Sequence, residues 1–324
     1  MAMRTRFRPS LFLAIAGAAA LAGAACGSGA DDAALPPDDP GVQTETAIRL
    51  GASGTPAAGD PVIIAAGDIA SCDGDGDEAT ALLLDTLAGT VVTLGDNVYD
   101  DGTSAEFAKC YGSSWGRHTA RTRPAPGNHD YHTGDAGGYY GYFGAAAGDP
   151  AKGYHSYSLG AWHIVVINSN CAAVGGCGDG SAQERWLRAD LAAHPAACTL
   201  AYWHHPRFSS GSVHGDDGGM QPIWQALYDH GADLVLNGHE HNYERFAPQS
   251  PSGAADARRG IVEIVVGTGG RSHYGFDSPK PNSLVRNSDT YGVLKLTLHE
   301  RSYDFQFVPE KGKPFTDVGS GACH

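Results

Sequence analysis

The chain reads VIIAAGD over residues 62–68 and TVVTLGD over residues 90–96. Each stretch is an apolar run followed by Gly-Asp, the pattern of a buried strand that ends in a polar turn. Between the two runs, a helix is expected from near Asp77 to Leu87, where Gly89 stops it. A strand, a helix and a second buried strand in succession predict an α/β fold with a parallel sheet.

Five short clusters of metal-ligand residue types lie along the chain, and four of them directly follow a run of this kind. They are GDIA (67–70), GDNVY (95–99), GNHD (127–130), WHHP (203–206) and GHEH (238–241). The ends of parallel strands line one crevice, so ligands far apart in sequence can converge there. Asp and Asn oxygens with His nitrogens suit first-row cations rather than a thiolate site. The sequence therefore predicts a dinuclear metallohydrolase.

The order of strand and helix continues through the middle of the chain. Strands are expected at 161–167, 199–202 and 233–236, and helices at 183–193 and 221–230. The last part changes character, because the apolar runs at 261–266, 291–298 and 302–307 have no helices between them. They predict an antiparallel portion that completes the sheets. The Gly-rich, aromatic segment 131–157 lacks periodicity and is expected to form a long loop over the site.

Residues 1–25 have the layout of an export signal peptide. A basic start is followed by an apolar stretch from Leu11 to about Leu21 and then by small residues. A transmembrane anchor is the alternative, but an apolar run of about 11–15 residues is short for a span that needs roughly 20. The sequence therefore favours an extracytoplasmic protein without a transmembrane span.

Charge and cysteine content agree with export. Without the leader's three arginines, 22 − 3 = 19 basic side chains face 36 acidic ones, a net charge of −17 that repels nucleic acid. Six cysteines follow Cys26, an even number that suggests up to three disulfides in an exported protein. The absence of a CxxC pair argues against a zinc-thiolate site.

Cys26 falls where the leader would be cut. LAGAAC (21–26) resembles a bacterial lipoprotein cleavage site, although Gly23 stands where that signal prefers a branched aliphatic residue. Residues 26–59 are rich in Gly, Ala, Pro and Asp without a periodic apolar pattern, which is the composition of a flexible linker. A secreted form and a lipoprotein anchored at Cys26 both stay open.

From about residue 61 to 310, the clusters resemble the calcineurin-like metallophosphoesterase superfamily and, within it, the purple acid phosphatase branch. The superfamily opens with Asp-x-His, but Ala70 stands at the place of that His. The branch lacks the His and takes a Tyr from Gly-Asp-x-x-Tyr, which Tyr99 supplies. The large amino-terminal β-domain of plant members is missing, so the resemblance is to the compact bacterial form. It implies an α/β fold over 60–324, a four-layer αββα metallophosphatase sandwich of two mixed sheets flanked by helices.

Position by position, the resemblance implies ligands for two metal ions. The first metal is expected on Asp68, Tyr99 and His241, the second on Asn128, His204 and His239, with Asp96 bridging both. His204 is preferred over His205 because the family ligand sits two residues before a proline, here Pro206. The resemblance further implies Fe(III) at the Tyr99 site and Fe, Zn or Mn at the second.

Two further histidines are candidates for catalysis. His129 follows Asn128 as the family's non-ligand His does, and would contact phosphate or protonate the leaving oxygen. His214 lies ten residues past His204, close to where the family places another substrate-facing His.

These roles predict hydrolysis of small phosphate monoesters by direct attack of a metal-bound hydroxide. A phosphodiesterase that uses the same metal centre is one alternative, against which Ala70 argues. A non-catalytic, metal-containing surface binding protein is the other, against which the spare acid-base group of His129 argues.

Overall fold

The two apolar runs that follow the linker form neighbouring strands of one sheet. The computed structural model describes residues 59–324. Within them, β1 (Val62–Ala66) pairs in parallel with β3 (Thr90–Leu94), and β3 pairs in parallel with β5 (Thr122–Ala125). The expected polar turns therefore lie at the same edge of this sheet.

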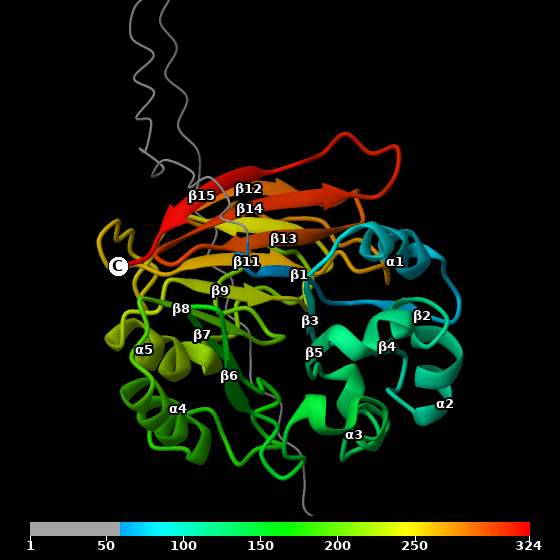
Figure 1. The fold of residues 1–324 in the computed structure, drawn as a ribbon, viewed down its shortest axis with the longest axis horizontal. Helices are drawn as coiled ribbons and strands as arrows, with labels where there is room; N and C mark the ends of the chain where they lie inside the picture. The colour runs from blue at the N-terminus through cyan, green and yellow to red at the C-terminus, as the bar shows by residue number, and fades with distance from the viewer. Residues whose placement is uncertain (1–58) are drawn as a thin grey trace, which may run out of the picture. The chain divides into compact units, whose positions relative to one another are not determined.

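Two mixed sheets form the centre of the molecule (Figure 1). The six-stranded sheet has the order β15-β14-β13-β1-β3-β5, and the seven-stranded sheet has the order β12-β10-β11-β9-β8-β7-β6. A two-stranded sheet of β2 (Ala70–Ser71) and β4 (Val98–Tyr99) lies beyond β1 and β3 along the chain. The remaining strands are β6 (His155–Leu159), β7 (Trp162–Val166), β8 (Cys198–Tyr202), β9 (Leu234–Asn237), β10 (Tyr243–Phe246), β11 (Val262–Val266), β12 (Ser283–Asn287), β13 (Gly292–Leu298), β14 (Ser302–Pro309) and β15 (Val318–Ala322).

Side chains along β7, β8 and β9 alternate between two hydrophobic cores, one on each face of the seven-stranded sheet. Ile164, Leu200 and Leu236 belong to the core cluster that also contains the strands of the six-stranded sheet. Their neighbours Val165 and Ala201 belong to a second cluster, with the helices on the opposite face. Successive side chains of a strand point to opposite faces, so one apolar run supplies both cores.

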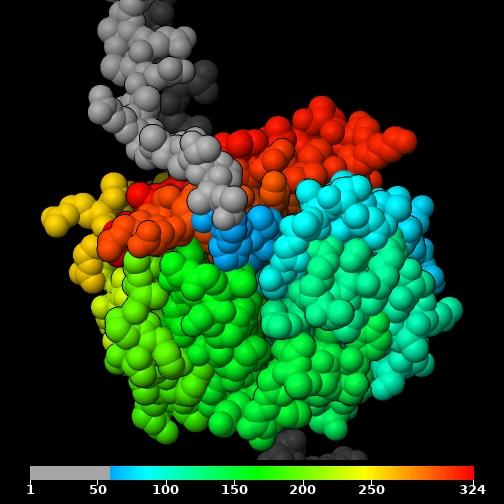
Figure 2. Space-filling model, viewed as in Figure 1, coloured from blue at the N-terminus to red at the C-terminus, as the bar shows by residue number. Residues whose placement is uncertain are grey.

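Helices cover the outer faces of the two sheets (Figure 1). On the seven-stranded sheet lie α4 (Ala182–Ala193), which begins at an N-cap where Ser181 accepts from the backbone of Glu184, and α5 (Gln221–Asp229). The other group contains α1 (Gly76–Thr86), α2 (Ser104–Glu106) and α3 (Gly137–Phe143). The first group lies on the left of the molecule and the second on the right, with strands of the two sheets between them in Figure 1, and Figure 2 shows the same two sides in space-filling form. The expected α/β sandwich of two mixed sheets flanked by helices is confirmed.

Two details of the predicted order of elements are wrong. The segment 131–157 is not one long loop, because α3 forms within it and β6 begins near its end. The aromatic side chains of Tyr139 and Phe143 in α3 are completely or almost completely buried. The run at 261–266 is not part of an antiparallel portion, because β11 pairs in parallel with β9. The antiparallel expectation holds for β13 and β14, which pair with each other.

All six cysteines after Cys26 pair, as the even count predicted. The disulfides are Cys72–Cys110, Cys171–Cys177 and Cys198–Cys323. The third joins Cys323, near the end of the chain, to β8 in the interior of the seven-stranded sheet. Three disulfides are typical of an extracytoplasmic protein.

The predicted export signal (1–25), Cys26 and nearly all of the predicted linker (26–59) lie outside the described residues. These expectations therefore stay predictions. Within residues 59–324, none of the helices is both long and apolar enough to cross a membrane.

Candidate metal centre

Three of the predicted ligands follow their strands in an unusual backbone conformation. Asp68, Asp96 and His239 have φ values of 59°, 47° and 71°, the left-handed region that non-glycine residues rarely adopt. Residues are held in this region mainly where surrounding structure over-determines them, and such residues cluster at functional sites. The three turns bring side chains from β1, β3 and β9 to one place.

Glycines allow the loops to close around these side chains. A Cβ atom at Gly127 would lie 2.1 Å from Oδ1 of Asp96, and one at Gly238 would lie 2.6 Å from Oδ2 of Asp68. Neither position could carry a side chain without displacing a carboxylate. Glycine is therefore needed at Gly127 and Gly238 because a carboxylate lies against the backbone there, and not only because the chain turns.

Tyr99 forms the centre of one group of contacts. Its hydroxyl lies 2.9 Å from Oδ1 of Asp68, 2.9 Å from Oδ2 of Asp96 and 3.1 Å from Nε2 of His241. Nδ1 of His241 contacts the hydroxyl of Ser272 at 2.7 Å, and with Nδ1 as the donor, Nε2 presents a lone pair. A phenol has a single proton to donate, yet three acceptors face it.

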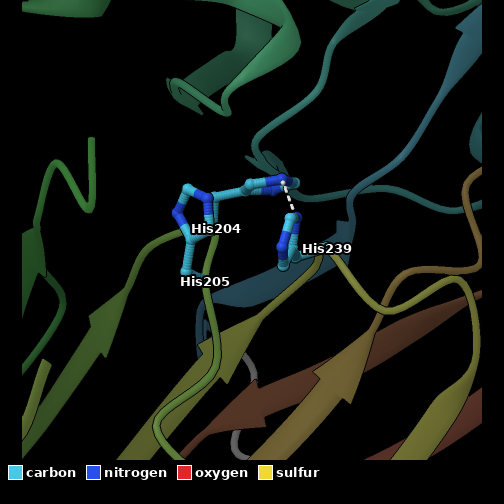
Figure 3. A group of neighbouring side chains, drawn as sticks. All are labelled: His204, His205 and His239. Carbon is cyan, nitrogen blue, oxygen red and sulfur yellow. Dashed lines mark hydrogen bonds between the residues drawn. The ribbon is translucent and has the colours of Figure 1, made fainter. Parts of the chain in front are cut away.

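His204 forms the centre of a second group. Its Nδ1 lies 2.8 Å from the carbonyl oxygen of Leu94, which can only accept, so Nδ1 carries a proton and Nε2 is the atom that faces the site. Nε2 lies 3.0 Å from Oδ1 of Asn128, 3.1 Å from Nδ1 of His239 and 3.3 Å from Oδ2 of Asp96. Figure 3 shows the imidazoles of His204 and His239 turned toward each other, with His205 beside them.

Oδ2 of Asp96 belongs to both groups, since it contacts Tyr99 and His204. Each group therefore contains more acceptor lone pairs than protons, in a place where Asp68, Asp96 and His204 are fully or almost fully buried. Unpaired acceptors facing one another in a buried site repel unless a cation lies between them. The donor set fits two divalent or trivalent cations that share one carboxylate oxygen.

The electrostatics of the site favour positive charge at its centre. Burial, with the carboxylates of Asp68 and Asp96, raises the pKa of Tyr99 well above its ordinary value. Burial alone would lower the pKa of His204, but the carboxylate of Asp96 raises it to about 9. Burial and the neighbouring His204 and His205 lower the pKa of His239, which keeps that imidazole neutral and able to act as a ligand.

His129 lies at the edge of the Tyr99 group. Its ring centroid is 4.3 Å from that of Tyr99, and its backbone N–H donates to Oδ1 of Asp96 at 2.8 Å. Nδ1 donates to the carbonyl oxygen of Asp100 at 2.6 Å, so Nε2 is the free nitrogen, and it lies 3.9 Å from Oδ2 of Asp96. A proton on Nε2 would therefore face the centre of the site.

His214 lies over the His204 group. Its ring stacks on that of His239, with 4.0 Å between centroids and 27° between planes. His214, ten residues after His204 in the sequence, therefore lies against a predicted ligand.

Three neighbours of the site have contacts that the sequence did not predict. Asp130 is completely buried and accepts from the backbone of Gly127 and from Asn97, and burial, followed by Asp96, raises its pKa to about 7. His205 contacts the hydroxyl of Ser169 at 2.7 Å, and burial and His204 lower its pKa to about 3. Asp130 belongs to GNHD and His205 to WHHP, so their place in these motifs was the sequence feature that could have indicated a position beside the site. Ser272, which contacts His241, follows β11 at a place that carries no motif.

A family model described as calcineurin-like phosphoesterase matches residues 59–243, more than half of the chain. The chain belongs to the calcineurin-like phosphoesterase family. This matched region contains all seven predicted ligands, together with His129 and His214. Metal-dependent phosphoester hydrolysis is the chemistry associated with the family, and the clusters of His and Asp side chains agree with it.

Relatives of this calcineurin-like chain include plant purple acid phosphatases. "Probable inactive purple acid phosphatase 27" of Arabidopsis thaliana is 27% identical over 254 residues, which cover 65% of this chain and 39% of the relative. "Purple acid phosphatase 15" of the same plant is 33% identical over 105 residues, or 31% of this chain and 19% of the relative. The chain thus spans well under half the length of these relatives, and one of them is named as inactive.

Solved structures show the same calcineurin-like phosphoesterase fold. The purple acid phosphatase PPD1 of yellow lupin has a TM-score of 0.65 at 19% identity, covering 81% of this chain and 53% of that one. GAP50, the anchor in the inner membrane complex of Plasmodium, has a TM-score of 0.61 at 15% identity, covering 82% and 89%. At such identities the likeness concerns the fold alone, so activity has to be argued from this chain's own residues.

Proposed function

We propose that the protein is a dinuclear-metal phosphomonoesterase of the purple acid phosphatase type. The observation that carries the proposal is the position of Oδ2 of Asp96, which lies within 3.3 Å of both the Tyr99 hydroxyl and Nε2 of His204. One carboxylate oxygen that belongs to two acceptor groups is what a pair of neighbouring cations requires. A single structural metal would need only one of the two groups.

Seven side chains would hold the two ions. Around the Tyr99 hydroxyl, the proposed ligands are Asp68, Tyr99 and His241; around Nε2 of His204, they are Asn128, His204 and His239; Asp96 belongs to both sets. We assign Fe(III) to the first set, because phenolate is a hard, electron-rich donor, and Fe, Zn or Mn to the second, in which two of the four ligands are imidazoles.

When bound, two such ions would supply a nucleophile from water at neutral pH and offset the charge of the phosphate oxygens. The protein's own side chains orient the reaction. His129 holds Nδ1 against the carbonyl of Asp100, so its Nε2 is the atom placed to give a proton to the leaving oxygen. In this proposal His214, whose ring stacks on that of His239, contacts the phosphate of the substrate.

The proposed substrate is a small phosphorylated molecule outside the cytoplasm. The net charge of −17 expected after removal of the predicted leader repels polyanions such as nucleic acid, while a small phosphate ester would be held by the cations and histidines within the site. A secreted form and a form anchored through a lipid at Cys26 both fit this proposed location.

The test is hydrolysis of p-nitrophenyl phosphate against bis-p-nitrophenyl phosphate, with metal-loaded and chelator-treated protein. Faster turnover of the monoester, abolished by the chelator and restored by iron or zinc, supports the proposal. Preference for the diester would instead assign a phosphodiesterase. No turnover of either ester by protein that contains both metals would assign a non-catalytic binding role, as the name of the relative described as inactive suggests for that protein.

A further inference from the structure

Glu240 stands between the two histidines of GHEH and is not among the proposed metal ligands. His239 and His241 turn toward the metal centre, whereas the carboxylate of Glu240 contacts a different segment, residues 211–215. Its Oε1 accepts from the backbone N–H of His214 at 2.5 Å and of Gly215 at 2.6 Å. One side chain of the motif therefore holds the backbone from which His214 projects.

The fit between Glu240 and this segment depends on a glycine. A Cβ atom at Gly211 would lie 2.2 Å from Cδ of Glu240 and 2.3 Å from its Oε2. Gly211 forms an antiparallel bridge with Phe276, and the N–H of Ser212 donates to the carbonyl of Gly275. The segment is thus held from the other side as well, and the carboxylate occupies the space that a side chain at position 211 would fill.

The segment carries an imidazole onto the proposed ligands. His214 stacks on His239 at 4.0 Å and lies 5.7 Å from the ring of Tyr274. Tyr274 in turn stacks on His241, with 3.9 Å between centroids and 9° between planes. The position of the backbone at residue 214 therefore determines where the imidazole of His214 lies relative to the His204 group.

Stability alone is a poor reason for a carboxylate in this place. Glu240 is completely buried, its Oε2 has no hydrogen-bond partner, and within residues 59–324 no lysine, arginine or histidine forms an ion pair with it. A buried carboxylate without a cationic partner is expensive to desolvate. Its two charge-assisted bonds to consecutive N–H groups offset part of that cost and fix the direction of the segment.

We infer that Glu240 is a positioning residue that holds His214 in place to contact the phosphate of the substrate. The inference rests on the proposed function, in which His214 faces the substrate. Because Glu240 lies between two proposed ligands, the same short motif fixes both the metal side and the substrate side of the site. Misplacement of such a group by about 1 Å can lower the rate about 100-fold.

The first test measures the segment itself and needs no activity. Amide hydrogen exchange of residues 211–215 is compared in the wild type, Glu240→Ala, Glu240→Gln and Gly211→Ala. Loss of the acceptor should speed exchange at His214 and Gly215 about tenfold or more, whereas the Gln carbonyl keeps most of the protection. Gly211→Ala should act like Glu240→Ala, because its Cβ displaces the carboxylate. Gly218→Ala is the matched control, since a Cβ there meets nothing within 4 Å.

The second test asks whether Glu240 acts through His214. Glu240→Ala should lower kcat/KM for p-nitrophenyl phosphate about 10-fold to 100-fold with both metals retained, and should have little further effect in a His214→Ala background. Additive effects of the two substitutions, loss of metal in Glu240→Ala, or unchanged exchange at His214 and Gly215 would overturn the inference. If the wild type lacks turnover, the proposed function fails, while the exchange experiment still decides whether Glu240 holds the segment.

Discussion

The hydroxyl of Tyr99 lies 2.9 Å from Oδ2 of Asp96, in the interior of the protein, where both side chains are almost completely buried. The contact joins two residues of one short motif, GDNVY, three positions apart. Because Asp96 contacts both acceptor groups, the contacts of the Tyr99 hydroxyl with Asp68 and His241 are what assign the phenolate to the first proposed metal.

Tyr99→Phe should bleach the iron-loaded protein. Phenolate donates charge to Fe(III) in a visible transition, and Phe lacks the donor oxygen, while Asp68, Asp96 and His241 can still hold a metal more weakly. The absorption spectrum and the iron content of the two proteins check this. Colour that survives the substitution would remove Tyr99 from the ligand set.

Asp96→Ala should lower the content of both metals and abolish hydrolysis, because it removes the one oxygen that belongs to both groups. His239→Ala should weaken mainly the second metal, since His239 contacts His204 and not Tyr99. Metal analysis after dialysis measures the difference. Asp149→Asn, an exposed position, is the control, and full activity of a metal-free Asp96→Ala protein would contradict the proposed metal-dependent hydrolysis.

His129→Ala should retain both metals and slow turnover by roughly 10²–10⁴ if Nε2 of His129 protonates the leaving group. The loss should shrink for a substrate whose leaving group needs no proton, so esters with good and poor leaving groups are compared. His230→Ala, an exposed residue at the end of α5, serves as control. Equal loss for all leaving groups would assign His129 to phosphate binding instead.

His299 should make stability depend on pH. Burial alone would lower its pKa, but hydrogen bonds with Asp60 and Asp304 raise it above the ordinary value of 6.5. The folded state then binds more protons, so this contribution is fully present below about pH 6.5 and is lost as pH rises through the raised pKa. His299→Gln should therefore lower Tm more at about pH 6 than at about pH 9.5. An equal difference in Tm at both values would exclude the charged pair.

Replacing Cys198 and Cys323 by Ser should destabilise the protein by about 2–4 kcal/mol, because the bridge closes a loop of 125 residues in the unfolded chain. Urea unfolding of oxidised wild type and double variant measures the change.

The wild type, denatured without reductant, should show no free thiol among its six paired cysteines. Two or more reactive thiols would undo the expected three disulfides.

The sequence predicted β1, β3, β8 and β9 because each is a continuous apolar run that ends in Gly or in a ligand motif. It missed β5, since Arg123 and Pro124 interrupt the apolar pattern at the edge of the six-stranded sheet. It missed α3, whose sequence GGYYGYF contains three glycines that disfavour a helix and is held by packing of its aromatic rings.

Motif composition by itself determined which residue types could bind metal, because Asp, Asn, Tyr and His side chains after buried strands have few other common uses together. Tertiary structure decided which atoms meet. The tautomer of His204 depends on the carbonyl of Leu94, 110 residues away, and the position of His214 depends on the carboxylate of Glu240. Such contacts join segments that only the pairing of strands brings together, so no local pattern encodes them.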